Sequence, residues 1–300
     1  MKNLFLILAL VFSVYISKAQ NTLYLGVGSN INKSAESQKT VDELAQYLSQ
    51  KLGIVVKINS LKAGKTLEQI QEGKLDVALM NTFGYVLASS EGNMEALVVV
   101  ANAQKKAITY QSCLIAHPST QIRTLEDLKK QASQYLLGFV SASSTSGHLI
   151  PRLFLNRLDL QPEISFKDVQ FAGSHQELIH KISLGELKIG AVSYTDLEEL
   201  TKSGKYKKSD FNILWTSEPI TNGPVSVRKD LSTSLKAKLQ EIWINLPKEN
   251  PTLNTKVVKL WHNTNAQSTF ISAQDSLYES IRKMANSMEE ISVLVGLYSE

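Results

Sequence analysis

The 300-residue sequence contains a single cysteine, Cys113, within the apolar stretch SCLIAH. One cysteine cannot form a disulfide inside the chain, so the hydrophobic core must supply the stability of the fold. We predict that Cys113 is buried and acts as a small hydrophobic side chain.

An excess of charge of one sign is also missing. The chain has 32 Lys and Arg residues against 28 Asp and Glu residues, which gives a net charge of +4, and it has no long run of like charge. Nucleic-acid-binding proteins usually gather basic residues into a strong patch. The composition therefore predicts that nucleic acid is not a partner.

Long apolar runs are absent except near the N-terminus. Lys2 is followed by an uncharged run over residues 4–16, which is shorter than the roughly 20 residues that a spanning helix needs. Small residues, Ser17 and Ala19, then precede Gln20. We predict a secretory signal peptide over residues 1–19 and a periplasmic location, with an uncleaved anchor as the alternative.

Motifs for catalysis and cofactor binding are likewise missing. The sequence has no H-E-x-x-H, no P-loop, no G-x-S-x-G and no paired cysteine and histidine ligands. These patterns accompany metalloproteases, nucleotide binding, serine hydrolases and structural zinc. We therefore predict no cofactor, no metal and no enzymatic activity.

What the chain does have is an alternation of short apolar runs and helical patterns. The runs that read as strands are residues 22–28, 54–59, 75–80, 96–101, 111–117, 135–140, 187–193 and 211–217. This alternation predicts an α/β fold whose sheets are largely parallel and are covered on both faces.

The elements fall into two sets, which predicts two lobes. Residues 20–105 together with 218–300 would form lobe 1, and residues 106–217 would form lobe 2. No flexible linker separates the sets, so we expect strands that cross between the lobes and act as a hinge.

The stretch SASSTSGHLIPR, residues 141–152, lies between a predicted strand and a predicted helix. The first N–H groups of a helix lack internal acceptors, and the helix dipole makes that end positive. Hydroxyl groups add donors there, and Gly147 would allow close approach to the backbone. The stretch predicts a site for a tetrahedral oxyanion; the alternative is a helix cap whose other hydroxyls are solvated.

Two further stretches carry candidate ligand contacts. In FAGSHQEL, residues 171–178, Ser174 and Glu177 form a capping box that places His175 in the first turn of a helix. A histidine there can donate to an oxyanion, although a surface histidine is the alternative. Thr82 and Tyr85 follow the strand at 75–80 and can contact the ligand, or can belong to a simple strand-to-helix turn.

Together these stretches resemble the phosphonate-binding subunit family of ABC importers. The resemblance rests on SASSTSGHLIPRLFL followed by FAGSHQELIHKISLGELKIGAVS, and is supported by GKLDVALM, YQSCLIAHPSTQIRTLEDL and ILWTSEPITNGPVSVRK. It covers roughly residues 24–250. It implies the type II periplasmic binding fold, in which a ligand is clamped between two lobes.

The resemblance also implies roles for single residues. Ser144, Thr145 and Ser146 would hold the phosphoryl oxygens, His175 would donate from the second helix, and Tyr110 would reach the ligand from the hinge side. These implied contacts match the oxyanion site that the hydroxyl stretch predicts.

The sequence departs from the family where an amino group would bind. Asp196 matches an acid that would hold the ligand's ammonium, although it can also simply open a helix. A second acid is expected just before the proline of TNGPV, where this chain has Gly223, and a tyrosine expected near residues 61–66 is missing. The departures predict a ligand without an amine, such as phosphate, phosphite or methylphosphonate.

We therefore predict a monomeric binding protein that captures a small phosphorus oxyanion and delivers it to the permease of an ABC importer. The alternative is a ligand sensor that presents its closed form to a membrane receptor.

Overall fold

The computed structural model describes residues 22–28, 34–61 and 65–284. The predicted signal peptide, residues 1–19, lies outside the described residues. So do residues 62–64 of the stretch at 61–66 where the resemblance places a tyrosine. Among the described residues, no helix is both long enough and apolar enough to cross a membrane.

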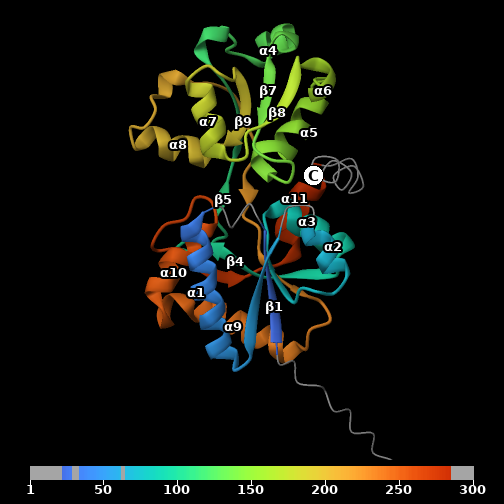
Figure 1. The fold of residues 1–300 in the computed structure, drawn as a ribbon, viewed down its shortest axis with the longest axis vertical. Helices are drawn as coiled ribbons and strands as arrows, with labels where there is room; N and C mark the ends of the chain where they lie inside the picture. The colour runs from blue at the N-terminus through green and yellow to red at the C-terminus, as the bar shows by residue number, and fades with distance from the viewer. Residues whose placement is uncertain (1–21, 29–33, 62–64, 285–300) are drawn as a thin grey trace, which may run out of the picture.

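Lobe 1 is built around a six-stranded sheet with the order β13-β4-β12-β3-β1-β2. Its strands are β1 (Thr22–Gly28), β2 (Val55–Leu61), β3 (Val77–Leu79), β4 (Met94–Ala101), β12 (Val225–Arg228) and β13 (Thr269–Ser272). The helices around it are α1 (Ala35–Leu52), α2 (Lys65–Gln71), α3 (Thr82–Glu91), α9 (Thr233–Glu249), α10 (Pro251–Val257) and α11 (Glu279–Arg282) (Figure 1).

Lobe 2 is built around a five-stranded sheet with the order β10-β6-β9-β7-β8. Its strands are β6 (Ser112–Ala116), β7 (Leu136–Phe139), β8 (Asp168–Phe171), β9 (Ile189–Ser193) and β10 (Asn212–Thr216). Its helices are α4 (Leu125–Gln131), α5 (Ile150–Arg157), α6 (Pro162–Ser165), α7 (His175–Ser183) and α8 (Tyr194–Lys202).

A short antiparallel ribbon lies between the two lobes. It pairs β5 (Thr109–Tyr110) with β11 (Ile220–Thr221), and Tyr110 lies opposite Ile220. Figure 1 shows β5 at the level where the chain passes from one lobe to the other. The ribbon places Tyr110 between the two sheets.

The sheets are mixed, so the prediction of largely parallel sheets is wrong. β1 pairs in parallel with β2 and β3, and β7 pairs in parallel with β8 and β9. β12 is antiparallel to both β3 and β4, and β6 is antiparallel to β9 and β10. A parallel pair needs a crossover connection, whereas β12 follows the hinge strand β11 directly and enters its sheet in the opposite direction.

Hydrophobic cores lie on the faces of both sheets. In lobe 2, Leu114 and Leu137 pack on one face, while Cys113 and Ile115 pack on the other. Neighbouring residues of a strand point to opposite faces, which explains why β6 is buried throughout. Cys113 is buried with a free thiol, as predicted.

Candidate ligand-binding site

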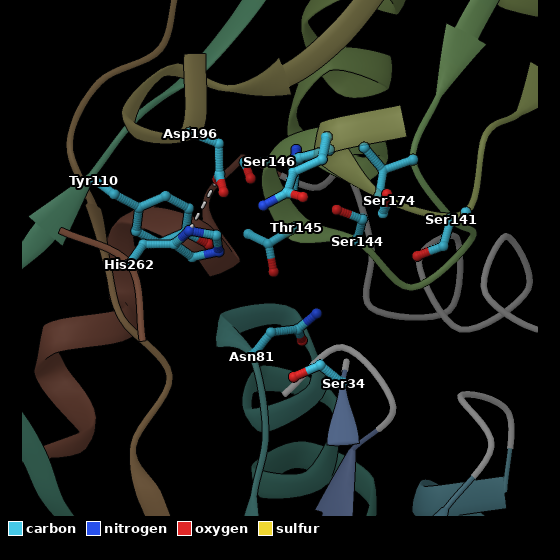
Figure 2. A pocket seen from close by; sticks show the side chains of 14 residues that line it. Ser34, Asn81, Tyr110, Ser141, Ser144, Thr145, Ser146, Ser174, Asp196 and His262 are labelled. Atoms are coloured by element: carbon cyan, nitrogen blue, oxygen red, sulfur yellow. Dashed lines mark ion pairs between the residues drawn. The ribbon is translucent and has the colours of Figure 1, made fainter. Parts of the chain in front are cut away.

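A cavity of about 460 Å³ lies between the lobes (Figure 2). It is lined by six of the eight residues that the sequence predicts as ligand contacts: Tyr110, Ser144, Thr145, Ser146, His175 and Asp196. Its size falls in the range of small-molecule sites. The structure thus brings most of the predicted contacts to one place.

The hydroxyl stretch forms a buried turn that leads into a π-helical turn, η3 (Thr145–Leu149). The Ser144 hydroxyl accepts a hydrogen bond from the Gly147 N–H at 3.0 Å, and the Leu149 N–H donates to the Ser144 carbonyl at 3.0 Å. The Ser112 hydroxyl donates to the Ser146 carbonyl at 2.6 Å. Ser144 is therefore a helix cap. Ser144, Thr145 and Ser146 are all buried rather than solvated.

The structure gives a packing reason for the glycine at position 147, whereas the sequence predicts that Gly147 allows close approach of a ligand to the backbone. It is not among the residues that line the cavity. A Cβ atom at this position would lie 2.4 Å from Cγ2 of Val140 and 2.9 Å from the Ser144 hydroxyl. Glycine fits this position because Val140 packs closely against the turn.

A buried polar network supports this turn from behind. The ring Nδ1 of His148 lies 2.6 Å from the Ala142 carbonyl, and the Arg152 Nε–H donates to His148 Nε2 at 2.8 Å. The Arg152 guanidinium also makes two hydrogen bonds to the Glu163 carboxylate. Burial, reinforced by the Arg152 charge, lowers the pKa of His148 to about 3, so its ring is neutral and donates from Nδ1 to Ala142.

His175 is held as a hydrogen-bond donor. It is buried at the start of α7, and its Nδ1 accepts a hydrogen bond from the Ser193 N–H at 2.9 Å. The proton of the neutral ring must then sit on Nε2. This tautomer suits an oxyanion as the partner.

His175, Asp196 and His262 offer ligand atoms that lie within 4.8 Å of one another, a spacing compatible with a metal ion. However, a metal-bound histidine normally donates a hydrogen bond from its second ring nitrogen. The second nitrogen of His175 accepts one instead. In this tautomer His175 offers the cavity a proton rather than a lone pair, which suits an oxygen acceptor better than a metal ion.

Tyr110 reaches the cavity from the hinge ribbon. Burial raises the pKa of its phenol to about 12, against the lowering effect of hydrogen bonds to the hydroxyls of Thr82, Thr145 and Ser146. The phenol is thus protonated at neutral pH. It belongs to a hydroxyl cluster that joins the hinge, α3 and the hydroxyl turn.

Thr82 and Tyr85 do not line the cavity. The Thr82 hydroxyl donates to the Thr221 carbonyl at 2.6 Å, and the Tyr85 hydroxyl donates to Asp275 at 2.6 Å while its ring packs on Tyr278. Tyr85 lies one turn beyond the start of α3, which carries it away from the cavity and into an apolar cluster that lobe 1 shares with α5 of lobe 2. Direct contact between these two side chains and a ligand stays a prediction that their placement does not support.

Sequence reasoning missed Ser34, Asn81 and His262, all of which line the cavity from lobe 1. Asn81 caps α3 by accepting from the Gly84 N–H at 2.8 Å, and it donates to the Ser143 carbonyl of lobe 2 at 2.7 Å. Ser34 caps α1. Both are the polar residue directly before a helix, the signal that identified Ser144, whereas His262 belongs to no motif.

The electrostatic character of the cavity comes from helix starts. Ser34, Asn81, Ser144 and Ser174 are the capping residues of α1, α3, η3 and α7, and Asp196 lies in the first turn of α8. Figure 2 shows the lobe 2 hydroxyls on one side of the cavity, facing Asn81 and Ser34 on the other. No lysine or arginine is found among the described lining residues. Such a site attracts an anion through aligned dipoles and neutral donors.

Gly223, where the resemblance places a second acid, has no room for a side chain. A Cβ atom there would lie 2.1 Å from the Met80 carbonyl oxygen and 2.6 Å from the Asn81 carbonyl carbon. The Gly223 carbonyl accepts from the Trp261 indole N–H at 2.7 Å. The backbone itself occupies the space that an acidic side chain at 223 would need.

Residues 30–278 match the family described as ABC transporter, phosphonate, periplasmic substrate-binding protein. The chain belongs to this family. Curated relatives include the phosphonates-binding periplasmic protein of Escherichia coli, which is 24% identical over 72% of this chain. That alignment spans 64% of the Escherichia coli protein, just under two thirds of its length.

Solved structures confirm the predicted fold. A binding protein component of an ABC phosphonate transporter from Pseudomonas aeruginosa is 21% identical, with a TM-score of 0.71 over 92% of this chain and 89% of the other. PhnD1 of Prochlorococcus marinus, solved with methylphosphonate, is 20% identical, with a TM-score of 0.69 over 88% of this chain and 97% of the other. The family member described here therefore has the type II periplasmic binding fold.

Proposed function

We propose that this family member binds a small phosphorus oxyanion in the cavity between its lobes and delivers it to the permease of an ABC importer. One observation carries the proposal: the helix starts and the hydroxyl turn meet at a single cavity. No lysine or arginine is found among the described residues that line it. Relatives named for phosphonates, and PhnD1 solved with methylphosphonate, support this ligand class.

In this proposal Ser144, Thr145 and Ser146 hold the phosphoryl oxygens, His175 donates from Nε2, and Tyr110 donates from the hinge. Lobe 1 (20–105 and 218–300) and lobe 2 (106–217) close around the β5–β11 ribbon, and the permease recognises the closed form. The Thr145 hydroxyl already accepts from the Phe83 N–H of lobe 1 at 3.3 Å. The protein works as a monomer in the periplasm after its signal peptide is removed.

The proposal assigns binding rather than catalysis. A serine nucleophile needs a base within hydrogen-bond reach. Both ring nitrogens of His148, the histidine nearest to Ser146 in sequence, are engaged with Ala142 and Arg152. His175 uses Nδ1 to accept from the backbone. These engagements favour fixed donors over proton-transfer groups.

The experiment is calorimetric titration of residues 20–300 with methylphosphonate, phosphate and phosphite, with sulfate as a non-phosphorus anion. Thr145→Ala removes a hydroxyl from the proposed oxyanion contacts, and Thr252→Ala removes an exposed hydroxyl on α10 as the matched control. We expect the dissociation constant of the best phosphorus ligand to rise about tenfold or more in Thr145→Ala and to stay unchanged in Thr252→Ala. Equal affinity in Thr145→Ala, Ser144→Ala and wild type would contradict the assigned site.

A further inference from the structure

His262 and Asp196 meet across the cavity, one from each lobe. His262 Nδ1 lies 3.2 Å from Oδ2 of Asp196, and the dashed line in Figure 2 marks this pair. Both side chains line the cavity and keep about a quarter of their surface exposed (23% each). The pair therefore faces any ligand that the hydroxyl turn holds.

His262 is fixed in place before a ligand arrives. Its backbone N–H donates to Oδ1 of Asn222 at 3.1 Å, and Nδ2 of Asn222 donates back to the His262 carbonyl at 3.0 Å. Its ring stacks on Tyr110, with centroids 4.5 Å apart and planes inclined by 21°. The imidazole is thus clamped beside the hinge with Nδ1 directed at Asp196.

Asp196 poses an electrostatic problem for an anion site. It is the only acidic side chain among the described lining residues, and no lysine or arginine lines the cavity beside it. The negative charge of Asp196 next to the hydroxyl turn would by itself repel a phosphorus oxyanion, because like charges disfavour each other strongly where solvent is partly excluded. A protonated His262 would cancel that charge from within the protein.

We propose that His262 is a specificity-determining residue that supplies the cation for Asp196, so that the cavity selects phosphorus oxyanions that carry no amino group. This inference rests on the proposed function and deepens it. An ammonium-bearing ligand would have to displace the clamped imidazole from Asp196 or lie against a second cation. An amine-free ligand meets a carboxylate that is already balanced.

The proposal ties binding to the positive charge of an imidazole that faces a carboxylate. The ionisable groups facing His262 are Asp196 and Glu199 on α8, His175 on α7, Tyr110 on β5 and Lys259 on the turn η5 (Val258–Leu260). The carboxylates attract a positive charge on the ring, and Lys259 repels it. Binding of an oxyanion is then expected to be accompanied by proton uptake.

The test compares methylphosphonate with 2-aminoethylphosphonate by calorimetry on wild type, His262→Asn, Asp196→Asn and the double variant. Asparagine keeps a hydrogen-bond donor near the position of Nδ1 but cannot carry charge. His180→Asn, at an exposed position on α7, is the matched control. Titrations in two buffers of different ionisation enthalpy report the protons taken up.

We expect wild type to prefer methylphosphonate, and His262→Asn to shift the ratio of the two dissociation constants toward 2-aminoethylphosphonate by about tenfold or more. Asp196→Asn in the His262→Asn background should restore most of the affinity for methylphosphonate, because the two groups are coupled. Proton uptake with methylphosphonate should be smaller in His262→Asn than in wild type or His180→Asn. Melting temperatures report whether each variant is folded.

The outcomes separate this inference from the function on which it rests. If wild type binds phosphorus oxyanions but His262→Asn leaves both the ratio and the proton uptake unchanged, the role of His262 is wrong and the proposed function stands. Preference of wild type for 2-aminoethylphosphonate would also overturn the role of His262. If wild type binds no phosphorus oxyanion at all, the proposed function and the inference fall together.

Discussion

The two walls of the cavity are built in different ways. The lobe 2 wall comes mainly from two short stretches, residues 140–146 and 173–176, each of which directly follows a strand end. The lobe 1 wall comes from Ser34, Asn81 and His262, which are far apart in the sequence. One wall is a set of local turns, and the other exists only because distant segments pack together.

This difference extends to what supports each wall. Behind the lobe 2 turn stands a network of side chains, His148, Arg152 and Glu163. Beside the lobe 1 wall stands close backbone packing, in which Gly223 lies against Met80 and Asn81. Side chains can adjust to a substitution more readily than a backbone can. We therefore expect the lobe 1 wall to be the less tolerant of change.

The largest expected effect is on the lobe 1 side. Gly223→Ala places a methyl group 2.1 Å from the Met80 carbonyl oxygen, a contact that only a shift of the backbone can relieve. Overpacking of this kind costs about 3 kcal/mol of unfolding free energy, which urea denaturation would measure. Because Asn81 must move too, ligand affinity should fall as well.

Gly204→Ala is the control for this prediction. A methyl group there meets nothing within 4 Å, but the backbone φ of 77° is left-handed. The strain of a left-handed alanine costs about 1 kcal/mol. Equal losses in the two variants would mean that the close approach at Gly223 is not what holds the lobe 1 wall.

A smaller effect is expected behind the lobe 2 wall. Arg152→Met keeps the length and the apolar packing of the side chain but removes the donor to His148 Nε2 and the ion pair with Glu163. An unpaired buried acceptor costs about 2 kcal/mol of unfolding free energy, while the half-exposed Glu163 can be hydrated. Arg157→Met, on the exposed side of the same helix, should lose far less. A similar loss in both variants would show that the network does not support the turn.

Much of the lobe 2 wall could be predicted from sequence, for a physical reason. A strand, a few short polar residues and a helix start are neighbours in the chain, so Ser144 and His175 can be placed at a sheet edge without knowledge of the packing. The same logic applies to Asn81, which caps α3, although the prediction names Thr82 and Tyr85.

His262 could not be predicted, because no local pattern marks it. It lies between η5 and β13, and it reaches the cavity only because Asn222 clamps its backbone and Tyr110 stacks on its ring. The direction of β12 was missed for a related reason, since strand pairing depends on where the returning chain enters the sheet.

The smallest expected effect uses pH to probe the lobe 2 support. Burial and the Arg152 charge lower the pKa of His148 to about 3 in the folded protein, whereas an unfolded histidine titrates near 6.5. As the pH falls from about 6.5 toward 3, the unfolded chain therefore takes up a proton that the folded chain excludes, and stability is lost. Between pH 6 and 5 this single site should remove about 1 kcal/mol of unfolding free energy.

Denaturation of wild type and His148→Gln at both pH values isolates the site, because carboxylates and other histidines contribute equally to both proteins. The loss of unfolding free energy between pH 6 and 5 should be about 1 kcal/mol smaller in His148→Gln than in wild type. It should be unchanged in the exposed control His180→Gln. Identical losses in all three proteins would mean that His148 takes up a proton in the folded protein and that the network behind the turn does not exclude it.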